Sequence, residues 1–306
     1  RPPRSTPKPS SAASDVYKRQ VFAVFLAHVP LGMLPHIGNK LWALKEPTQR
    51  MQFIRLAFVF ALILAMLGFG GIMARVILGE GIDSNQALAL LFIDLFPSWF
   101  AALLGVGILA AVMSTADGLV VSSSQIVAND LYRLSFVPRY RKDLSEEEIE
   151  RRSLNISRIS TVVIMILCTL LAWQTLDMNV TILVWIGVGC MMAAFAGPLI
   201  LGSVWSGVTK AGAFAGLLTG GGVYIITYLG VINPEWFGPG SLKDIALWLQ
   251  RESPNPYSCA AMGEIASIAV TVVVSKLTAP YPKEHIDALF GKSAVSYTHL
   301  TLPTKA

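Results

Sequence analysis

Six long apolar runs constrain this chain more than any other feature of its sequence. Each holds about twenty or more residues with few or no charges, the length that a helix needs to cross the roughly 30 Å hydrocarbon core of a bilayer. Runs of this length are too long for the strands of a compact domain. They are residues 53–79, 97–128, 159–176, 180–205, 211–232 and 258–278.

Two further apolar segments are too short to span. Residues 21–33 are interpreted as the remaining half of a seventh span, and residues 85–96 predict a re-entrant or surface helix. Since backbone polar groups in lipid must be satisfied within their own segment, the whole pattern predicts an all-α, polytopic bundle of transmembrane helices.

Charged residues in the loops predict the orientation of the spans. The loops 34–52 and 129–158 carry Lys and Arg and are expected in the cytoplasm, whereas 80–96 has acidic but no basic residues and is expected outside, as are 177–179. Residues 144–154 place Glu three and four positions before Arg, which favours a solvated connecting helix.

The formal net charge of +5 comes from the two ends of the chain. Residues 1–20 and 294–306 hold six of the 24 basic and one of the 19 acidic residues, so the remainder carries 18 of each. Since the rest of the chain has no net charge, no nucleic-acid partner is expected. The expected partner is the lipid bilayer, because of the long apolar runs. Only 14% of residues are charged, against about 25% in a soluble domain.

Both end segments are expected to lie outside the fold. DVYKRQ and VSYTHLTLPT resemble translated adapter sequence; the alternative is a disordered tail rich in Pro and Ser. The expected domains are a non-native or disordered tail over 1–20, a transmembrane domain over 21–293, truncated at its start, and a second tail over 294–306.

The sequence holds no motif for enzymatic chemistry. Its three cysteines and four histidines show no metal-ligand spacing, and HExxH, GxSxG, GxxxxGK[ST] and GxGxxG before a helix are all missing. An enzyme is therefore not expected.

The most informative segment is GILAAVMSTADGLVVSSSQIVANDLYR, residues 107–133. In a helix the hydroxyls of Ser114 and Thr115 point back to the carbonyl of Ala111, which brings three neutral oxygens together. Such a cluster suits a monovalent cation that must bind and leave. The alternative is that both hydroxyls only hydrogen-bond across a helix interface.

Asp117 lies three positions after Ser114, midway along the same span. A carboxylate there is costly unless it faces a partner or water. It is interpreted either as a cation contact or cavity-lining acid, or as an acid paired with a buried donor.

Other positions carry open alternatives. Gly197 and Pro198 interrupt their span and are interpreted as a gating hinge or a plain kink. Trp185 and His28 are candidate solute contacts, with an interfacial aromatic as the alternative for Trp185. Three further expectations concern Gly212, Gly216 and Gly220 as a helix-packing stripe, Arg75 as an interfacial side chain, and Glu264 as an acid with a partner on a neighbouring helix.

Four segments together resemble the sodium:solute symporter family over roughly residues 21–278. The segment LAAVMSTADGLVVSSS, followed by NDLYR, resembles its signature helix. The other three are MLPHIGNKLW (33–42), AAFAGPLILGSVW (193–205) and KAGAFAGLLTGG, which starts at residue 210.

The resemblance implies two five-helix inverted repeats around a central site for sodium and solute. Ala111, Ser114 and Thr115 would contribute the sodium ligands of this chain, which would comprise the second repeat and two C-terminal helices. The implied function is sodium-coupled import of a small polar or carboxylate-bearing solute, by alternating access, in the bacterial inner membrane. The alternative is a sensory module that keeps the transporter fold.

Overall fold

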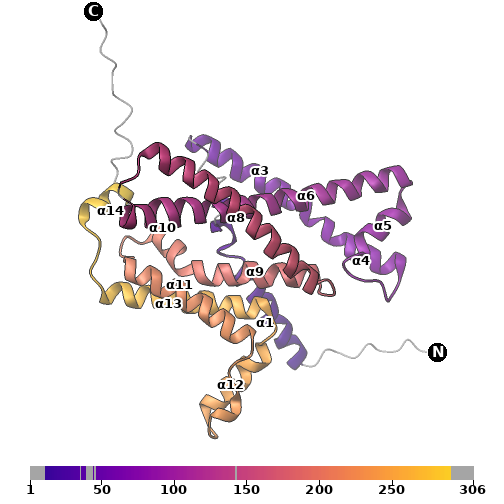
Figure 1. The fold of residues 1–306 in the computed structure, drawn as a ribbon. Coiled ribbons are helices and arrows are strands. Elements are labelled where there is room, and N and C mark those ends of the chain that lie inside the picture. Colours follow the sequence, from indigo (N-terminus) through magenta and orange to yellow (C-terminus); the bar gives the residue numbers. More distant parts are fainter. Residues whose placement is uncertain (1–10, 35, 39–43, 45, 142, 291–306) are drawn as a thin grey trace, which may run out of the picture. The chain divides into compact units, whose positions relative to one another are not determined.

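The computed structural model describes residues 11–34, 36–38, 44, 46–141 and 143–290, and every regular element in these ranges is helical (Figure 1). This confirms the all-α expectation. Residues 1–10 of the tail expected over 1–20, and the whole of the tail expected over 294–306, lie outside the described residues. The chain divides into two compact units, one containing Arg1–Leu34 and Val184–Ala306 and the other containing Pro35–Leu183.

The unit of Pro35–Leu183 is built around α6, which packs against α5 and α8. Ser145 begins α8 as its N-cap, because its hydroxyl accepts a hydrogen bond from the Glu148 N–H at 3.3 Å. The helices are α3 (Pro47–Ala65), α4 (Leu67–Leu78), α5 (Ala87–Leu95), α6 (Ser98–Gln125), the π-helix η2 (Ile126–Phe136), α7 (Val137–Tyr140) and α8 (Glu146–Gln174).

The helices of this unit extend beyond their apolar runs. The extent predicted for the loop 129–158 is wrong. The helix that begins at Ser98 continues to Tyr140, and α8 begins at Glu146, so the two helices take up most of this range. Residues 144–154 are helical from Glu146 onward, with Arg152 paired to Glu148 at 3.6 Å as the spacing predicts, but they form the first turns of α8 rather than a separate connecting helix. Hydropathy marks where a helix leaves lipid, whereas the helix itself continues through charged residues with good helix propensity.

The two loops expected on the outer side are hydrogen-bonded to each other. The Asn179 side-chain amide donates to Ser84 Oγ at 2.8 Å, and the Val180 N–H donates to Asn85 Oδ1 at 3.1 Å. These bonds hold 80–96 beside 177–179, which is consistent with both segments lying on one side of the membrane. The expected short helix in the first loop is present as α5.

The second unit is built around the antiparallel pair α11 and α13, against which α1 and η3 pack. Helix α1 begins at Ser11, inside the segment expected as a tail, and ends at Ala27, before the end of the expected half-span. Helix α9 (Val180–Phe195) belongs to this unit from Val184 onward, because the boundary between the units falls inside it. The other elements are α1 (Ser11–Ala27), η1 (Leu31–Met33), the π-helix η3 (Ala196–Leu201), α10 (Gly202–Val204), α11 (Lys210–Tyr228), η4 (Pro234–Trp236), α12 (Ser241–Glu252), α13 (Pro256–Leu277) and α14 (Lys283–Phe290).

Glycines allow α11 to approach α13 closely, as the sequence predicts. All three members of the stripe are buried on α11. A Cβ at Gly212 would collide with Ser275, one at Gly216 with Thr271, and one at Gly220 with the carbonyl of Ala193. The stripe is therefore a packing surface, because any side chain there would separate the helices.

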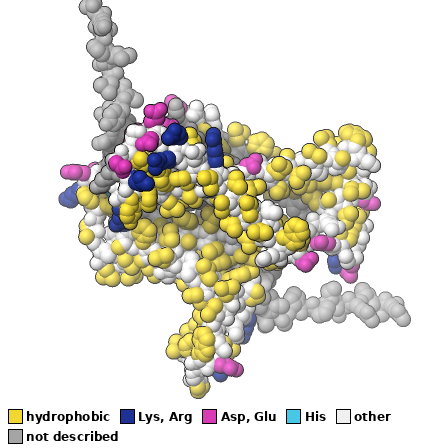
Figure 2. All heavy atoms as spheres, in the orientation of Figure 1, with side chains coloured by type: hydrophobic (Ala, Val, Ile, Leu, Met, Phe, Trp, Pro, Cys, Tyr) yellow, Lys and Arg dark blue, Asp and Glu magenta, His cyan; other side chains and the backbone are white. Residues whose placement is uncertain are grey.

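Within the described ranges, six helical segments are long and apolar enough to cross a membrane, judged by length and composition. Large hydrophobic side chains lie exposed along them, including Phe58 at 64% and Trp173 at 77% exposure, and Figure 2 shows how widely such side chains cover the visible face. Lipid is the environment that such surfaces require. The segments are Thr48–Leu78, Ser98–Tyr140, Glu146–Gln174, Val180–Val204, Lys210–Tyr228 and Pro256–Leu277.

Candidate functional site

Three oxygens meet at one point on α6, as expected from the sequence. Ser114 Oγ donates a hydrogen bond to the Ala111 carbonyl at 2.9 Å, and Thr115 Oγ1 donates to the same carbonyl at 3.2 Å. Because each hydroxyl gives its proton to the helix, its lone pairs face away from the helix. We call these three atoms the oxygen cluster of α6.

The oxygen cluster is exposed within its own unit. Ala111, Ser114 and Thr115 are all exposed, and a Cβ at Gly118, one turn on, would meet no atom within 4 Å. No hydroxyl of the cluster donates a hydrogen bond to another helix in the described ranges of the unit. The interface alternative thus has no support among these residues, and the cluster is open to a ligand or a further helix.

Asp117 shares this open region of α6. Its side chain is exposed and forms no hydrogen bond or ion pair with any described residue. The alternative of an acid paired with a buried donor is therefore not seen. By contrast, the serine run that follows, residues 122–124, packs against α8: Ser124 is 3% exposed and its hydroxyl accepts a hydrogen bond from Ser157 of α8 at 3.4 Å.

His28 and Trp185, candidates from distant parts of the sequence, lie together in the other unit. Their ring centroids are 4.4 Å apart, and Trp185 is in turn 4.6 Å from the ring of Tyr257 at the start of α13. His28 is held by a 2.6 Å hydrogen bond between its Nδ1 and the Val24 carbonyl, and Tyr224 donates to the Trp185 carbonyl at 3.4 Å. We call His28, Trp185 and Tyr257 the aromatic group.

The aromatic group is partly open. His28 is exposed, whereas Trp185 and Tyr257 are half-buried, and Trp185 packs against a buried cluster that includes Ala193 and Ala260. Sequence reasoning missed Tyr257, because its position at a helix start gave no functional signal. The group presents two aromatic rings and one imidazole, which suits contact with a small organic solute.

The expected hinge coincides with a π-helix. Gly197 and Pro198 lie in η3, where the hydrogen-bond pattern of the span widens, as is common at functional positions. The hydroxyl of Ser267 on α13 accepts from the Gly197 N–H at 3.0 Å and donates to the Ala194 carbonyl at 3.3 Å. A side chain from another helix therefore satisfies the backbone groups that the irregular turn exposes.

A buried polar row runs along α13 and was not identified as a unit from the sequence. Ser267 and Thr271 are fully buried, Glu264 is 2% exposed and Ser275 is 5% exposed. Their spacing of three or four residues places them on one helix face, and this periodicity in an apolar span is the signal that could have found them. We call these four residues the polar face of α13.

The partner expected for Glu264 is missing from the described residues. Its Oε1 is buried and has no hydrogen-bond partner there, and no described basic side chain pairs with it. The described residues thus do not supply the partner that the sequence led us to expect. Arg75, expected at the interface, forms an exposed ion pair with Glu80 at 2.8 Å.

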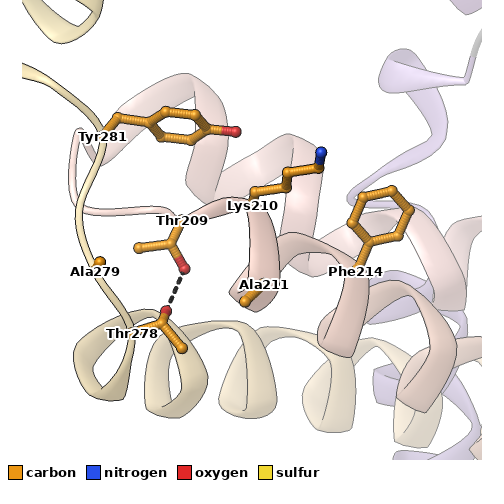
Figure 3. A pocket seen from close by; sticks show the side chains of 7 residues that line it. All are labelled: Thr209, Lys210, Ala211, Phe214, Thr278, Ala279 and Tyr281. Atoms are coloured by element: carbon orange, nitrogen blue, oxygen red, sulfur yellow. Dashed lines mark hydrogen bonds between the residues drawn. The ribbon is translucent and has the colours of Figure 1, made fainter. Parts of the chain in front are cut away.

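A cavity of about 490 Å³ lies at the far end of the α11–α13 pair. Figure 3 shows the Lys210 ammonium and the Tyr281 hydroxyl extending along its wall, with Phe214 beyond them. Its base is fixed by a 2.6 Å hydrogen bond between Thr209 Oγ1 and Thr278 Oγ1. The cavity and the aromatic group lie at opposite ends of α13, roughly 30 Å apart along the helix.

Comparison with known proteins identifies a family for this chain. The chain matches the sodium:solute symporter family over residues 7–220. It is 27% identical to a sodium/pantothenate symporter of Haemophilus influenzae over 219 residues, which cover 69% of this chain and 43% of the relative. It is 30% identical to a sodium/proline symporter of Staphylococcus aureus over 173 residues, which cover 56% of this chain and 30% of the relative.

The chain therefore belongs to the sodium:solute symporter family, and it is a multi-pass membrane protein of a transporter class rather than an enzyme. It spans less than half the length of these two relatives. No solved structure matches it at a significant level.

Proposed function

We propose that the protein containing this chain couples the inward movement of sodium to the uptake of a small polar or carboxylate-bearing solute across a bacterial cell membrane. The oxygen cluster of α6 carries this proposal. One carbonyl and two hydroxyl oxygens form a neutral, partial coordination shell, which binds a monovalent cation without holding it permanently. Family membership supports sodium as the ion.

The remaining ligands for sodium would come from a helix of the first repeat. The resemblance implies that residues 21–293 comprise only the second repeat and the helices that follow it. The exposure of Ala111, Ser114 and Thr115 within their unit supports this view, since the cluster still has room for further oxygens. On this proposal the chain alone does not transport.

The aromatic group is the proposed contact for the solute, with Asp117 as a second candidate. Pantothenate and proline, which the two relatives are named for, both carry a carboxylate. Since the Nδ1–H of His28 is given to the Val24 carbonyl, its Nε2 can donate a hydrogen bond to such a group when both ring nitrogens are protonated, while the rings of Trp185 and Tyr257 cover the apolar part of the solute. This leaves the identity of the solute to direct measurement.

Alternating access would use the π-helix η3 as its hinge. The irregular turn at Gly197 and Pro198 is held by the single hydroxyl of Ser267, so a modest movement of α13 would release it. Sodium binding would favour the outward-open state and raise the affinity for solute. Linkage requires that solute raises the affinity for sodium by the same factor.

The test is sodium-driven uptake by the full-length protein in membrane vesicles, measured over a range of sodium concentrations with Ser114→Ala and Thr115→Ala. Each variant removes one ligand, so we expect the sodium concentration for half-maximal uptake to rise about tenfold or more. Thr169→Ala is the matched control, because Thr169 on α8 also donates its hydroxyl to its own helix, at 2.8 Å from the Met165 carbonyl. Unchanged sodium dependence in both test variants contradicts the assignment.

A further inference from the structure

Glu264 is the one carboxylate that the described chain buries within a predicted membrane span. It lies about two turns into α13, is 2% exposed, and its Oε1 has no hydrogen-bond partner among the described residues. An ionised carboxylate in such a place costs several kcal/mol unless a cation or several donors offset its desolvation.

Among the side chains that the structure describes, the elements packed on α13 offer no cation at the level of Glu264. Gly212 faces Ser275 and Gly220 faces Ser267, so Lys210 at the start of α11 lies near the far end of α13, as does Lys276. The π-helix η3 has no titratable side chain. The side chains of Asp15, Tyr17 and Arg19 on α1 lie outside the described ones. The other titratable groups on α1, α9, α11 and α13 are Lys18, which is exposed, Cys190, Tyr224, Tyr228, Tyr257 and Cys259.

None of these neutral groups hydrogen-bonds to Glu264. Tyr224 donates to the Trp185 carbonyl, and the Cys259 thiol lies 4.0 Å from the Glu252 carbonyl. Because the described residues leave Glu264 only 2% exposed, little room remains for a side chain from another helix to reach its buried Oε1. The carboxyl must therefore be satisfied by something small enough to be held inside this enclosure.

The surroundings favour a proton over a metal cation. A sodium ion needs several oxygens around it, but the nearest hydroxyl along the face, that of Ser267, is already engaged with Gly197 and Ala194. Thr271 lies two turns further on, about 10 Å along the helix, and the Glu264 side chain leans toward the N-terminus and so away from it. A single proton removes the charge without any further ligand.

We propose that Glu264 is a proton-binding site inside the packed unit formed by α11, α13 and η3. The packed chain holds the carboxyl as the neutral acid. When α13 separates from its neighbours, the O–H bond breaks, the electron pair remains on the carboxylate oxygen and the proton passes to water. This inference rests on burial and on the lack of a partner, and it does not depend on the assignment of the sodium ligands.

The experiment is infrared spectroscopy of the whole chain in lipid bilayers at neutral pH. We expect a C=O stretching band of a protonated carboxylic acid that is lost in Glu264→Gln and kept in Glu235→Gln, which replaces an exposed acid of the same unit. Glu264→Asp should retain a band at a shifted frequency, which guards against a Gln variant that fails to fold. Absence of any band that depends on Glu264 overturns the proposal.

A second measurement follows thermal unfolding between about pH 5 and about pH 8. The unfolded chain releases this proton above about pH 4.3 while the packed chain retains it, so the unfolding temperature should fall as pH rises. Glu264→Gln should flatten this fall, and Glu235→Gln should not. A carboxyl band that disappears when sodium is added at constant pH would instead identify a sodium site and overturn the proposal.

Discussion

The oxygen cluster of α6 and the polar face of α13 use similar residues to opposite effect. On α6 the hydroxyls of Ser114 and Thr115 donate to their own helix and are exposed. On α13 the Ser267 hydroxyl bonds to a different element, and the whole face is buried. A hydroxyl that donates to its own helix therefore keeps its lone pairs available to a ligand, whereas a hydroxyl that bonds to a neighbouring element holds the two elements together.

The largest effect that this comparison predicts is for Gly220→Ala, at the centre of the contact between α11 and α13. The added methyl group would lie 2.8 Å from the Ser267 Cβ and would collide with the Ala193 carbonyl, a backbone atom that cannot rotate away. We expect a loss of about 3 kcal/mol or more in unfolding free energy, measured by thermal unfolding in detergent.

Gly222→Ala is the matched control for this substitution. It lies on the same helix, but a Cβ there would meet no atom within 4 Å. Since Ala has a higher helix propensity than Gly, this variant should be as stable as the parent or slightly more so. Equal losses in the two variants would mean that α11 and α13 do not pack in this way.

The second prediction compares the two faces directly. Ser267→Ala leaves the Gly197 N–H and the Ala194 carbonyl without their shared partner in a buried place, so we expect a loss of about 1–3 kcal/mol in unfolding free energy. Ser114→Ala should change stability by less than about 0.5 kcal/mol, because its hydroxyl bonds only to its own helix. If Ser114→Ala is the more destabilising, the comparison is wrong.

The sequence could predict whatever depends on local geometry. The oxygen cluster follows from hydroxyls that reach back three or four residues in any helix, and the glycine stripe from a four-residue spacing. The group of His28, Trp185 and Tyr257 could not be predicted, since its members are far apart in the chain and meet only through packing.

The same distinction explains the errors. Hydropathy locates spans but not helix ends, so the loop expected over 129–158 was placed on residues that are partly helical. The environment of Glu264 depends on which elements pack around it, and no described residue donates a hydrogen bond to its Oε1. A buried partner is thus the kind of feature that a single sequence leaves open.

A third prediction concerns the helix caps of the two units. Thr209 begins α11; it is 2% exposed and its Oγ1 accepts from the Gly212 N–H at 3.1 Å while bonding to Thr278. Ser145 begins α8 in an exposed position with a single 3.3 Å bond. We expect Thr209→Ala to cost about 2 kcal/mol and Ser145→Ala about 1 kcal/mol or less. Thr209→Ser, which keeps the oxygen, should recover most of the loss in the same unfolding assay.

The smallest expected effect is at the exposed ion pair of Arg75 and Glu80. Their 2.8 Å separation is short, but the side chains are 62% and 86% exposed, so water and salt screen the attraction. Glu80→Gln should therefore change the unfolding free energy by less than about 0.5 kcal/mol, and by still less when the thermal scan is repeated in high salt. A larger loss, or one that salt does not reduce, would show that this region is more enclosed than its exposure indicates. Glu264→Gln provides the contrast, because that substitution removes an acid without a partner and should alter the pH dependence of stability rather than its salt dependence.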